Sequence, residues 1–298
     1  MIQEKKFNEF KSLLGQKLTI LEDKPEETVD STLKALWLKA AGISKPAEEA
    51  IKSDLPDLSN KQISDLERLI EQRLNNTPLA HLTGKQLFMG IELLSDNRAL
   101  IPRKETEILG KAALEACKLI ASNKENPLVL DICCGSGNLG IALALLEPKI
   151  KVYCSDLSPD AIDLANENIK FHNLSGRVNA RQGSLFEPFY NNDFIGKVDL
   201  IVCNPPYIST AKVRKMNSEI SNNEPTLAFD GGMLGTKVIQ QLLNEATIYL
   251  RQGGHLLFEI GLQQGQFFYG LCLKHHKFKE VSTVNDSAGN IRVIYCKV

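Results

Sequence analysis

The chain has 298 residues, of which 43% are hydrophobic and 24% are charged, and its formal net charge is -1. This length suffices for one large α/β domain and a smaller one, and the composition excludes collagen-like, disordered and membrane classes. A net charge near zero supplies no general positive field for nucleic acid. No stretch approaches the ~18 to 20 apolar residues that a membrane span needs.

The seven cysteines indicate neither a disulfide framework nor a metal site. Their number is odd, and the sequence contains no Cys-x-x-Cys motif and no nearby Cys/His cluster. Several lie in apolar runs typical of buried strands, where a thiol behaves as a small apolar group. The start of the chain also lacks an apolar signal core. We therefore expect a cytoplasmic protein with reduced thiols, no metal and no membrane partner.

Residues 1–77 carry helical patterns. Between residues 30 and 41 apolar side chains recur at three- and four-residue steps. Ser59 and Gln62 have the spacing of a capping box, and a second apolar stripe follows them and ends at Leu74. We expect a small N-terminal helical domain over 1–77.

The pattern changes after residue 77. Glycines separate the short apolar pieces Gln86–Met89 and Ile91–Leu94, which predicts a β-hairpin linker over 78–103. From 104 to 298 apolar strand runs alternate with helical stretches, which is typical of a mostly parallel sheet in an α/β, Rossmann-like domain. The seven expected strands are Leu128–Ile132, Lys151–Ser155, Val178–Gln182, Val198–Cys203, His255–Ile260, Glu280–Val284 and Arg292–Cys296. The turn-rich loop between the last two predicts an antiparallel hairpin at the sheet edge.

The first of these strands leads into a glycine turn, Cys133-Cys134-Gly135-Ser136-Gly137, and then into a helix. The two glycines allow the backbone to approach a ligand closely. Free N–H groups at the start of a helix favour electron-rich ligand groups. Dinucleotide-binding proteins contain such turns, and so do tight turns that bind nothing, so the turn alone leaves these alternatives open.

Two acids favour adenosine over a dinucleotide. Asp131 lies four residues before Gly135, where it can orient the turn and an amino group beside it, whereas dinucleotide folds place the first glycine almost directly after the strand. Asp156 ends the next strand, where its carboxylate can accept both ribose hydroxyls. Ser158 already caps the following helix, with Pro159 in its first turn, so the cap does not require Asp156.

The fourth expected strand ends in Asn204-Pro205-Pro206-Tyr207. Ligands bind at the carboxyl ends of strands in sheets of this kind. The prolines lack N–H donors and stiffen the loop, which leaves the Pro205 carbonyl beside the Asn204 side-chain carbonyl. Two fixed acceptors suit an –NH2 group conjugated to a carbonyl or a ring, and Tyr207 could cover a planar substrate. Methyl transfer then follows from proximity and electrostatics, without a metal or a covalent enzyme intermediate; a purely structural Asx turn is the alternative.

At this point the chain resembles a known family. The segments Asp131–Gly140, Asp156 and Asn204–Tyr207 look like class I S-adenosylmethionine-dependent methyltransferases that act on amide or exocyclic nitrogens. The remainder is similar to the HemK/PrmC family, the glutamine methyltransferases of peptide-chain release factors. That similarity is carried by Thr77–Gly84, Leu100–Glu107, Asn223–Pro225, Phe229–Gly232 and Ala288–Arg292.

The resemblance implies a class I methyltransferase domain and an N-terminal helical domain that docks the release factor. It implies methyl transfer from S-adenosyl-L-methionine, leaving S-adenosyl-L-homocysteine, to the side-chain amide nitrogen of the Gln in a Gly-Gly-Gln motif. The cofactor-binding residues implied or inferred are Asp131, Cys133, Cys134, Gly135, Ser136, Gly137, Asp156, Leu157, Ser184, Leu185 and Asn204.

The catalytic and substrate-binding residues that the resemblance implies are Asn204, Pro205, Pro206 and Tyr207. We add Arg103, at the domain junction, as a residue that lines the substrate mouth. The expected partner is a release factor, with no direct contact to nucleic acid, and the expected state is a monomer.

Three positions depart from the family pattern. Cys133-Cys134 replace the usual Gly-Thr, Lys104 replaces a Pro, and Ser184 stands where Asp or Asn is common. These changes leave open a paralogue that methylates a small amide or amine. An amino-methyltransferase on nucleic-acid bases is a second alternative, disfavoured by the net charge. A non-enzymatic cofactor-binding scaffold is a third, disfavoured by the intact tetrapeptide.

Overall fold

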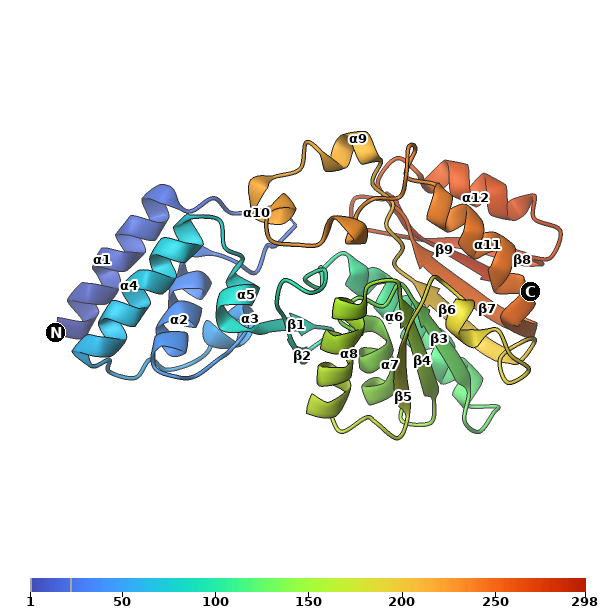
Figure 1. Ribbon diagram of the computed structural model, residues 1–298, viewed down its shortest axis with the longest axis horizontal. Coiled ribbons are helices and arrows are strands. Elements are labelled where there is room, and N and C mark those ends of the chain that lie inside the picture. Colours follow the sequence, from blue (N-terminus) through green and yellow to red (C-terminus); the bar gives the residue numbers. More distant parts are fainter. Residues whose placement is uncertain (1, 22) are drawn as a thin grey trace. The chain divides into compact units, whose positions relative to one another are not determined.

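The structure is a computed structural model that describes residues 2–21 and 23–298, and the chain forms two compact units (Figure 1). Unit 1 consists of Met1–Asn97, Ile101–Arg103 and Asn217–Glu224. Unit 2 consists of Arg98–Leu100, Lys104–Met216 and Pro225–Val298. Each unit therefore combines stretches that are far apart in the sequence.

Unit 1 is mainly helical. Its elements are α1 (Ile2–Lys17), α2 (Val29–Ala40), α3 (Ala47–Ala50), α4 (Asn60–Leu74), α5 (Leu79–Thr83), the antiparallel strands β1 (Lys85–Phe88) and β2 (Ile91–Leu94), and α10 (Ser218–Ser221). The predicted capping box of α4 is confirmed, because the Ser59 side chain accepts from the Gln62 N–H and Gln62 reaches back to the Ser59 backbone. Apolar side chains of α2 and α4, among them Leu36, Trp37 and Leu66, are buried in one core. This burial explains the apolar stripes in the sequence.

Unit 2 contains a seven-stranded sheet in the order β5-β4-β3-β6-β7-β9-β8 (Figure 1). Its strands are β3 (Leu128–Ile132), β4 (Lys151–Asp156), β5 (Val178–Gln182), β6 (Val198–Cys203), β7 (Leu250–Glu259), β8 (Glu280–Asn285) and β9 (Ile291–Lys297). The first five pair in parallel, and β9 pairs antiparallel with both β7 and β8. The expected mostly parallel sheet with a C-terminal antiparallel hairpin is thus confirmed.

The helices of unit 2 connect and cover these strands. They are α6 (Thr106–Ala121), α7 (Asn138–Leu146), α8 (Pro159–Phe171), α9 (Thr210–Val213), α11 (Lys237–Tyr249), α12 (Gly265–Leu273) and the short 3-10 helices at Glu187–Phe189 and Thr226–Ala228. All six residues of β6 are buried, as expected for a central strand covered on both faces. Chain order reverses between β3 and β6, and ligands bind at such a switch point in open α/β sheets.

One strand differs from its expected extent. β7 begins at Leu250, five residues before His255, and includes Gly253 and Gly254. Two glycines disfavour a strand in a sequence pattern, but here close packing requires one of them. A Cβ at Gly254 would lie 2.9 Å from the Arg251 carbonyl oxygen and 3.0 Å from that of Val198. β7 therefore begins before the apolar run from which the strand His255–Ile260 was expected.

None of the helices in residues 2–21 and 23–298 combines the length and the apolar character that crossing a bilayer requires.

Candidate active site

The carboxyl ends of four parallel strands of unit 2 lie side by side. Ile132 of β3 pairs with Ser155 of β4 and with Cys203 of β6, and β4 pairs in turn with β5. The predicted segments that follow these strands, which include the glycine turn and the Asn-Pro-Pro-Tyr tetrapeptide, therefore meet at one edge of the sheet. The sheet thus joins residues that are up to about 70 positions apart.

The glycine turn adopts a conformation that suits its composition. Gly135 and Gly137 have φ values of 53° and 81°, in the left-handed region that favours glycine. Gly137 is the N-cap of α7, and its N–H donates to the Cys134 carbonyl at 2.8 Å. A Cβ at Gly135 would have no atom within 4 Å. The turn therefore leaves open space above its backbone, which is what a ligand-binding turn needs.

Cys133 occupies a backbone conformation that normally belongs to glycine. Its φ is 60°, and a side chain there costs on the order of 1 to 2 kcal/mol. The half-buried side chain packs against the core of unit 2, beside the buried Cys203. The replacement of the usual glycine has therefore added a side chain while the left-handed turn is kept.

Asp131 is fully buried beneath the turn. Its Oδ2 accepts the N–H of Gly140 at 2.8 Å, whereas Oδ1 has no hydrogen-bond partner among the described residues. Burial raises the pKa of Asp131 to about 7, and the Gly140 N–H only partly opposes this. No described cation compensates the carboxylate. Asp131 therefore orients the start of α7 and keeps one acceptor uncommitted.

Asp156 cross-links the turn to β4. Its Oδ2 accepts the Gly135 N–H at 2.9 Å, and its Oδ1 accepts the Ser158 N–H at 2.9 Å. Burial raises the pKa of Asp156, while these N–H bonds lower it. The predicted cap is confirmed, because the Ser158 hydroxyl accepts the Ala161 N–H and Pro159 is the first residue of α8. Each carboxylate oxygen of Asp156 retains a further lone pair for a ligand hydroxyl.

The loop after β5 carries two more of the predicted residues. Leu185 is buried with a φ of 46°, and its carbonyl accepts the Ser155 hydroxyl at 2.6 Å. The Ser184 N–H donates to Glu187 Oε2 at 3.1 Å. Leu157, by contrast, is 49% exposed. Ser155 was not among the predicted site residues, although a hydroxyl that ends an apolar strand is a recognisable signal.

The tetrapeptide is held from the side and from behind. The Asn204 Nδ2 donates to Thr106 Oγ1 at 3.1 Å. The Tyr207 hydroxyl donates to Glu259 Oε1 at 3.0 Å and lies 3.3 Å from Glu105 Oε1. No donor of the described chain bonds the Pro205 carbonyl oxygen. Asn204 Oδ1 and this carbonyl therefore remain as acceptors.

Glycines and one glutamine fix the backbone of Tyr207. A Cβ at Gly235 would collide with the Tyr207 carbonyl oxygen, and one at Gly231 would lie 2.5 Å from the Pro206 carbonyl oxygen. Gln264 Nε2 donates to the Tyr207 carbonyl at 3.0 Å. The Phe229–Gly232 motif thus supports the tetrapeptide by close backbone packing, a role that its sequence alone does not reveal.

A polar cluster behind the tetrapeptide was missed by sequence reasoning. Glu259, the last residue of β7, is 1% exposed, and burial followed by repulsion from Glu105 raises its pKa to about 7. Arg292 Nη2 lies 2.9 Å from Glu105 Oε2 and 3.5 Å from Glu259 Oε1. Burial and the two acids raise the pKa of Tyr207 well above its ordinary value, so its hydroxyl is neutral. A glutamate inside an apolar strand run was the available signal.

Arg103 lies in unit 1. It is 7% exposed, and its Nη2 donates to Glu224 Oε1 at 2.6 Å, while the Ile101 N–H donates to Glu224 Oε2 at 2.9 Å. Burial lowers the pKa of Arg103, but Glu224 and Asp23 outweigh this and raise it. The ion pair between Arg103 and Glu224 therefore joins two of the segments that carried the resemblance, Leu100–Glu107 and Asn223–Pro225. The expected contact of Arg103 with substrate stays a prediction.

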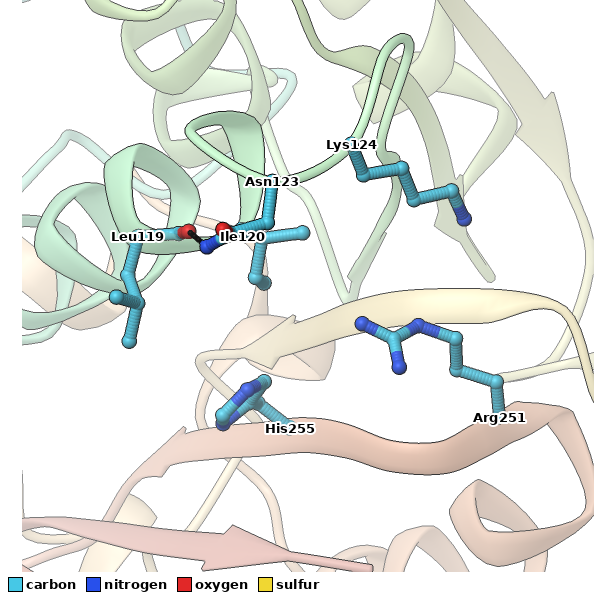
Figure 2. A pocket seen from close by; sticks show the side chains of 6 residues that line it. All are labelled: Leu119, Ile120, Asn123, Lys124, Arg251 and His255. Carbon is cyan, nitrogen blue, oxygen red and sulfur yellow. Dashed lines mark hydrogen bonds between the residues drawn. The ribbon is translucent and has the colours of Figure 1, made fainter.

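A hollow of about 500 Å³ lies at the opposite, amino edge of the sheet of unit 2 (Figure 2). Its lining residues come from the end of α6, the loop after it and β7: Leu119, Ile120, Asn123, Lys124, Arg251 and His255. Lys124 and Arg251 both pair with the buried Asp199. Burial raises the pKa of Asp199, but these partners hold it below its ordinary value. Lys124 and Arg251 therefore both bind Asp199 near the start of β6. None of the predicted site residues lines the hollow.

No group of three or more His, Cys, Asp or Glu side chains in residues 2–21 and 23–298 is arranged to hold a metal ion. The seven cysteines of this part of the chain are free thiols.

Known proteins are similar to most of the chain. Residues 115–234 match the methyltransferase small domain family. Release factor glutamine methyltransferase of Thermodesulfovibrio yellowstonii is 34% identical over 239 residues, which cover 80% of this chain and 83% of that protein. The proteins of that name from Geobacter sulfurreducens and Moorella thermoacetica are 32% and 35% identical over 89% and 75% of this chain, and over 89% and 76% of their own lengths. The resemblance seen in the sequence is therefore confirmed: the chain belongs to the release factor glutamine methyltransferase family.

Proposed function

We propose that this protein transfers the methyl group of S-adenosylmethionine to the side-chain amide nitrogen of the glutamine in the Gly-Gly-Gln motif of a peptide-chain release factor. Family membership supports the reaction. The observation that carries it is the pair of uncommitted acceptors, Asn204 Oδ1 and the Pro205 carbonyl, at the carboxyl edge of the sheet beside the glycine turn. An amide –NH2 has two protons, one for each acceptor.

The residues at the glycine turn fit the cofactor. Gly135 has open space above it, and the buried Asp131 Oδ1 and Ser136 Oγ lack partners among the described residues. We infer that the turn holds the methionine part, that Asp156 accepts the ribose hydroxyls, and that Leu157, Ser184 and Leu185 border the adenosine. When bound, S-adenosylmethionine supplies an electrophilic methyl group on a sulfonium centre.

The chemistry of the chain's own residues is positioning and electrostatics. An amide nitrogen is planar and its lone pair is delocalised, so it is a weak nucleophile. Hydrogen bonds from its two protons to Asn204 Oδ1 and Pro205 O hold the group and strengthen as positive charge develops on nitrogen. The neutral Tyr207 ring covers the planar amide from the side. As the N–C bond forms, the bond between the methyl carbon and sulfur would break and its electron pair would stay on sulfur, which leaves as the neutral thioether of S-adenosylhomocysteine. One of the two amide protons leaves through its acceptor to water, which restores a neutral amide.

Unit 1 is proposed to dock the protein substrate, with residues 1–77 contributing most of this surface, because every proposed cofactor contact lies in unit 2. A release factor works in translation, so we place the reaction in the cytoplasm, carried out by a monomer.

Incubation with methyl-labelled cofactor and the host's release factors tests the proposal directly. We expect label on the glutamine of Gly-Gly-Gln, and no label on a release factor whose motif glutamine is replaced by alanine. Label on nucleic acid or on a free small amide instead would refute it. In a thermal unfolding assay S-adenosylhomocysteine should raise Tm and NAD should not, since a ligand of the native state stabilises it; the reverse preference would refute the assignment of the glycine turn.

A further inference from the structure

Three stretches of unit 2 meet behind the tetrapeptide. Thr106 is the first residue of α6, Asn204 follows β6, and Glu259 ends β7. Thr106 and Glu259 are each 1% exposed. Asn204 Nδ2 donates to Thr106 Oγ1 at 3.1 Å, and the Thr106 hydroxyl faces the Glu259 carboxylate, whose Oε2 has no hydrogen-bond partner among the described residues. The buried carboxylate is thus connected to the Asn204 amide through one hydroxyl.

The protons available to Asn204, Thr106 and Glu259 determine which group donates and which accepts in each hydrogen bond. A threonine hydroxyl has one proton and two lone pairs, and an ionised carboxylate only accepts. With its proton given to Glu259, Thr106 Oγ1 can only accept from Asn204. The side of the Asn204 amide that faces Thr106 must then be its –NH2, which places Oδ1 on the other side.

We propose that Thr106 and Glu259 are positioning residues that set the orientation of the Asn204 amide, so that its Oδ1 accepts a proton of the substrate amide. An inverted Asn204 would present N–H donors to the –NH2 of the substrate and remove one of its two acceptors. This inference rests on the proposed methyl transfer to an amide nitrogen.

Glu259 also has the right neighbours to hold the second part of the tetrapeptide. The Tyr207 hydroxyl donates to its Oε1 at 3.0 Å, with Glu105 on the other side of that hydroxyl. Among the described residues, Arg292 of β9 is the cation that pairs with the two acids, at 3.5 Å from Glu259 and 2.9 Å from Glu105. The ionised carboxylate therefore accepts from both Thr106 and Tyr207, and fixes both ends of the Asn-Pro-Pro-Tyr segment.

Protonation of Glu259 would release this constraint. With its pKa at about 7, a fall in pH below neutrality adds a proton to the carboxyl group, which can then donate to Thr106. The Thr106 proton becomes available to Asn204 Oδ1, and the amide can invert. Turnover should therefore fall as the pH is lowered through about 7.

The first test compares substitutions that remove one hydroxyl. Thr106→Val keeps the shape of the side chain, and its turnover should fall about 10- to 100-fold, the usual cost of a lost buried hydrogen-bond partner. Thr106→Ser should restore turnover to within about threefold of wild type, and both should bind S-adenosylhomocysteine as wild type does. The matched control is Thr247→Val in α11, whose buried hydroxyl has no hydrogen-bond partner among the described residues. Equal turnover of Thr106→Val and Thr247→Val would overturn the proposal.

A second readout does not depend on activity. In protein labelled with 15N-asparagine, the Asn204 side-chain signal is the one that disappears in Asn204→Ala. We expect its chemical shift to change in Thr106→Val and to stay the same in Thr247→Val. An unchanged chemical shift in Thr106→Val would overturn the positioning role. Absence of methyl transfer by wild type to any release factor would instead refute the proposed function, and the spectra would still show whether Thr106 contacts the Asn204 amide.

The pH profile tests Glu259. Glu259→Gln cannot ionise, so its turnover should lose the decline below pH 7 that wild type shows. A Glu259→Gln protein that binds S-adenosylhomocysteine and keeps the wild-type decline would exclude Glu259 as the group responsible.

Discussion

Unit 1 and unit 2 both bury charged side chains, but they compensate them differently. In unit 1 Glu219 contacts two cations, Lys24 at 2.8 Å and Arg73 at 2.8 Å, and Arg73 also contacts Glu27 at 2.9 Å. Burial raises the pKa of Glu219, but its two cations bring it below the ordinary value. Glu27 forms an ion pair with Arg73, and burial raises its pKa.

Asp199 of unit 2 is also paired with two cations, but two acids near the carboxyl edge of its sheet are not. Among the described residues no cation pairs with Asp131, and Glu259 has Arg292 at 3.5 Å, so burial raises the pKa of each to about 7. The difference shows two uses of a buried charge. Fully paired charges in unit 1 hold a distant segment, Asn217–Glu224, in place. Poorly compensated acids in unit 2 keep acceptor capacity for ligands and neighbouring side chains, at a cost to stability.

The largest expected effect comes from breaking the paired cluster. Arg73→Met leaves two buried carboxylates without this cation, so the free energy of unfolding should fall by about 3 to 5 kcal/mol. Denaturant titration measures the change. Arg68→Met is the control in the same helix, because Arg68 is exposed and pairs only with Asp65, and it should cost under about 0.5 kcal/mol. Similar losses in both variants would mean that the buried pairs do not hold unit 1 together.

The uncompensated acids predict how stability changes with pH. The folded pKa of Asp131 is about 7 against an ordinary 3.8. Its contribution is therefore present below pH 4 and is lost as the pH rises through 7, a difference of about 4 kcal/mol. Asp131→Asn keeps an acceptor for Gly140 and cannot ionise, so its stability relative to wild type should improve from pH 4 to pH 8.

Urea unfolding at several pH values checks this prediction. Asp286→Asn is the control of opposite sign, because hydrogen bonds from Asn290 lower the pKa of the exposed Asp286. Its stability relative to wild type should not improve with rising pH. A flat difference between Asp131→Asn and wild type would mean that Asp131 is not a buried ionisable acid.

Next in size is the effect of Asn204 on turnover. Asn204→Ala deletes one of two acceptors that strengthen in the transition state, and such a loss typically costs about 100- to 1000-fold. Affinity for S-adenosylhomocysteine should change far less, because Asp156 and the glycine turn hold it. Asn123→Ala, at the opposite sheet edge, should turn over as wild type does. Turnover of Asn204→Ala within about threefold of wild type, under ~0.7 kcal/mol of barrier, would make the tetrapeptide only a rigid loop.

Asp156 gives the smallest of these effects. Asp156→Ala removes a charged acceptor from the ribose hydroxyls and a hydrogen bond from Gly135, so calorimetry should show cofactor binding weaker by about 1.5 to 3 kcal/mol. Asp156→Asn, which keeps an acceptor, should lose less. Unchanged affinity in Asp156→Ala would place this carboxylate outside the site.

The sequence predicted those elements whose pattern lies in residues adjacent along the chain. The strands Leu128–Ile132 and Val198–Cys203 were found because each is a continuous apolar run with turn residues behind it, and these strands bring the glycine turn and the tetrapeptide together. The partners of the tetrapeptide could not be found in this way. Thr106 is 98 positions from Asn204 and Glu259 is 52 from Tyr207, and only the tertiary fold joins them.

The segment Asn217–Glu224 was missed for a related reason. It is polar and has no apolar periodicity, so it reads as an exposed loop. Glu219 and Glu224 are nonetheless 1% and 5% exposed, because Lys24, Arg73 and Arg103, more than 100 positions away, compensate them. Charge pairing of this kind leaves no local pattern.

The discontinuous construction of unit 1 has a consequence for the order in which the protein matures during synthesis. Lys24, Arg73 and Arg103 leave the ribosome well before Glu219 and Glu224 exist, and at about 5 to 20 residues per second the interval from residue 103 to residue 224 lasts roughly 6 to 24 s. Throughout that interval these cations lack the acids that later bury them. Unit 1 therefore reaches its final form only after β6 and the tetrapeptide have been made, and a chain stalled before residue 217 has neither a finished N-terminal unit nor a finished sheet.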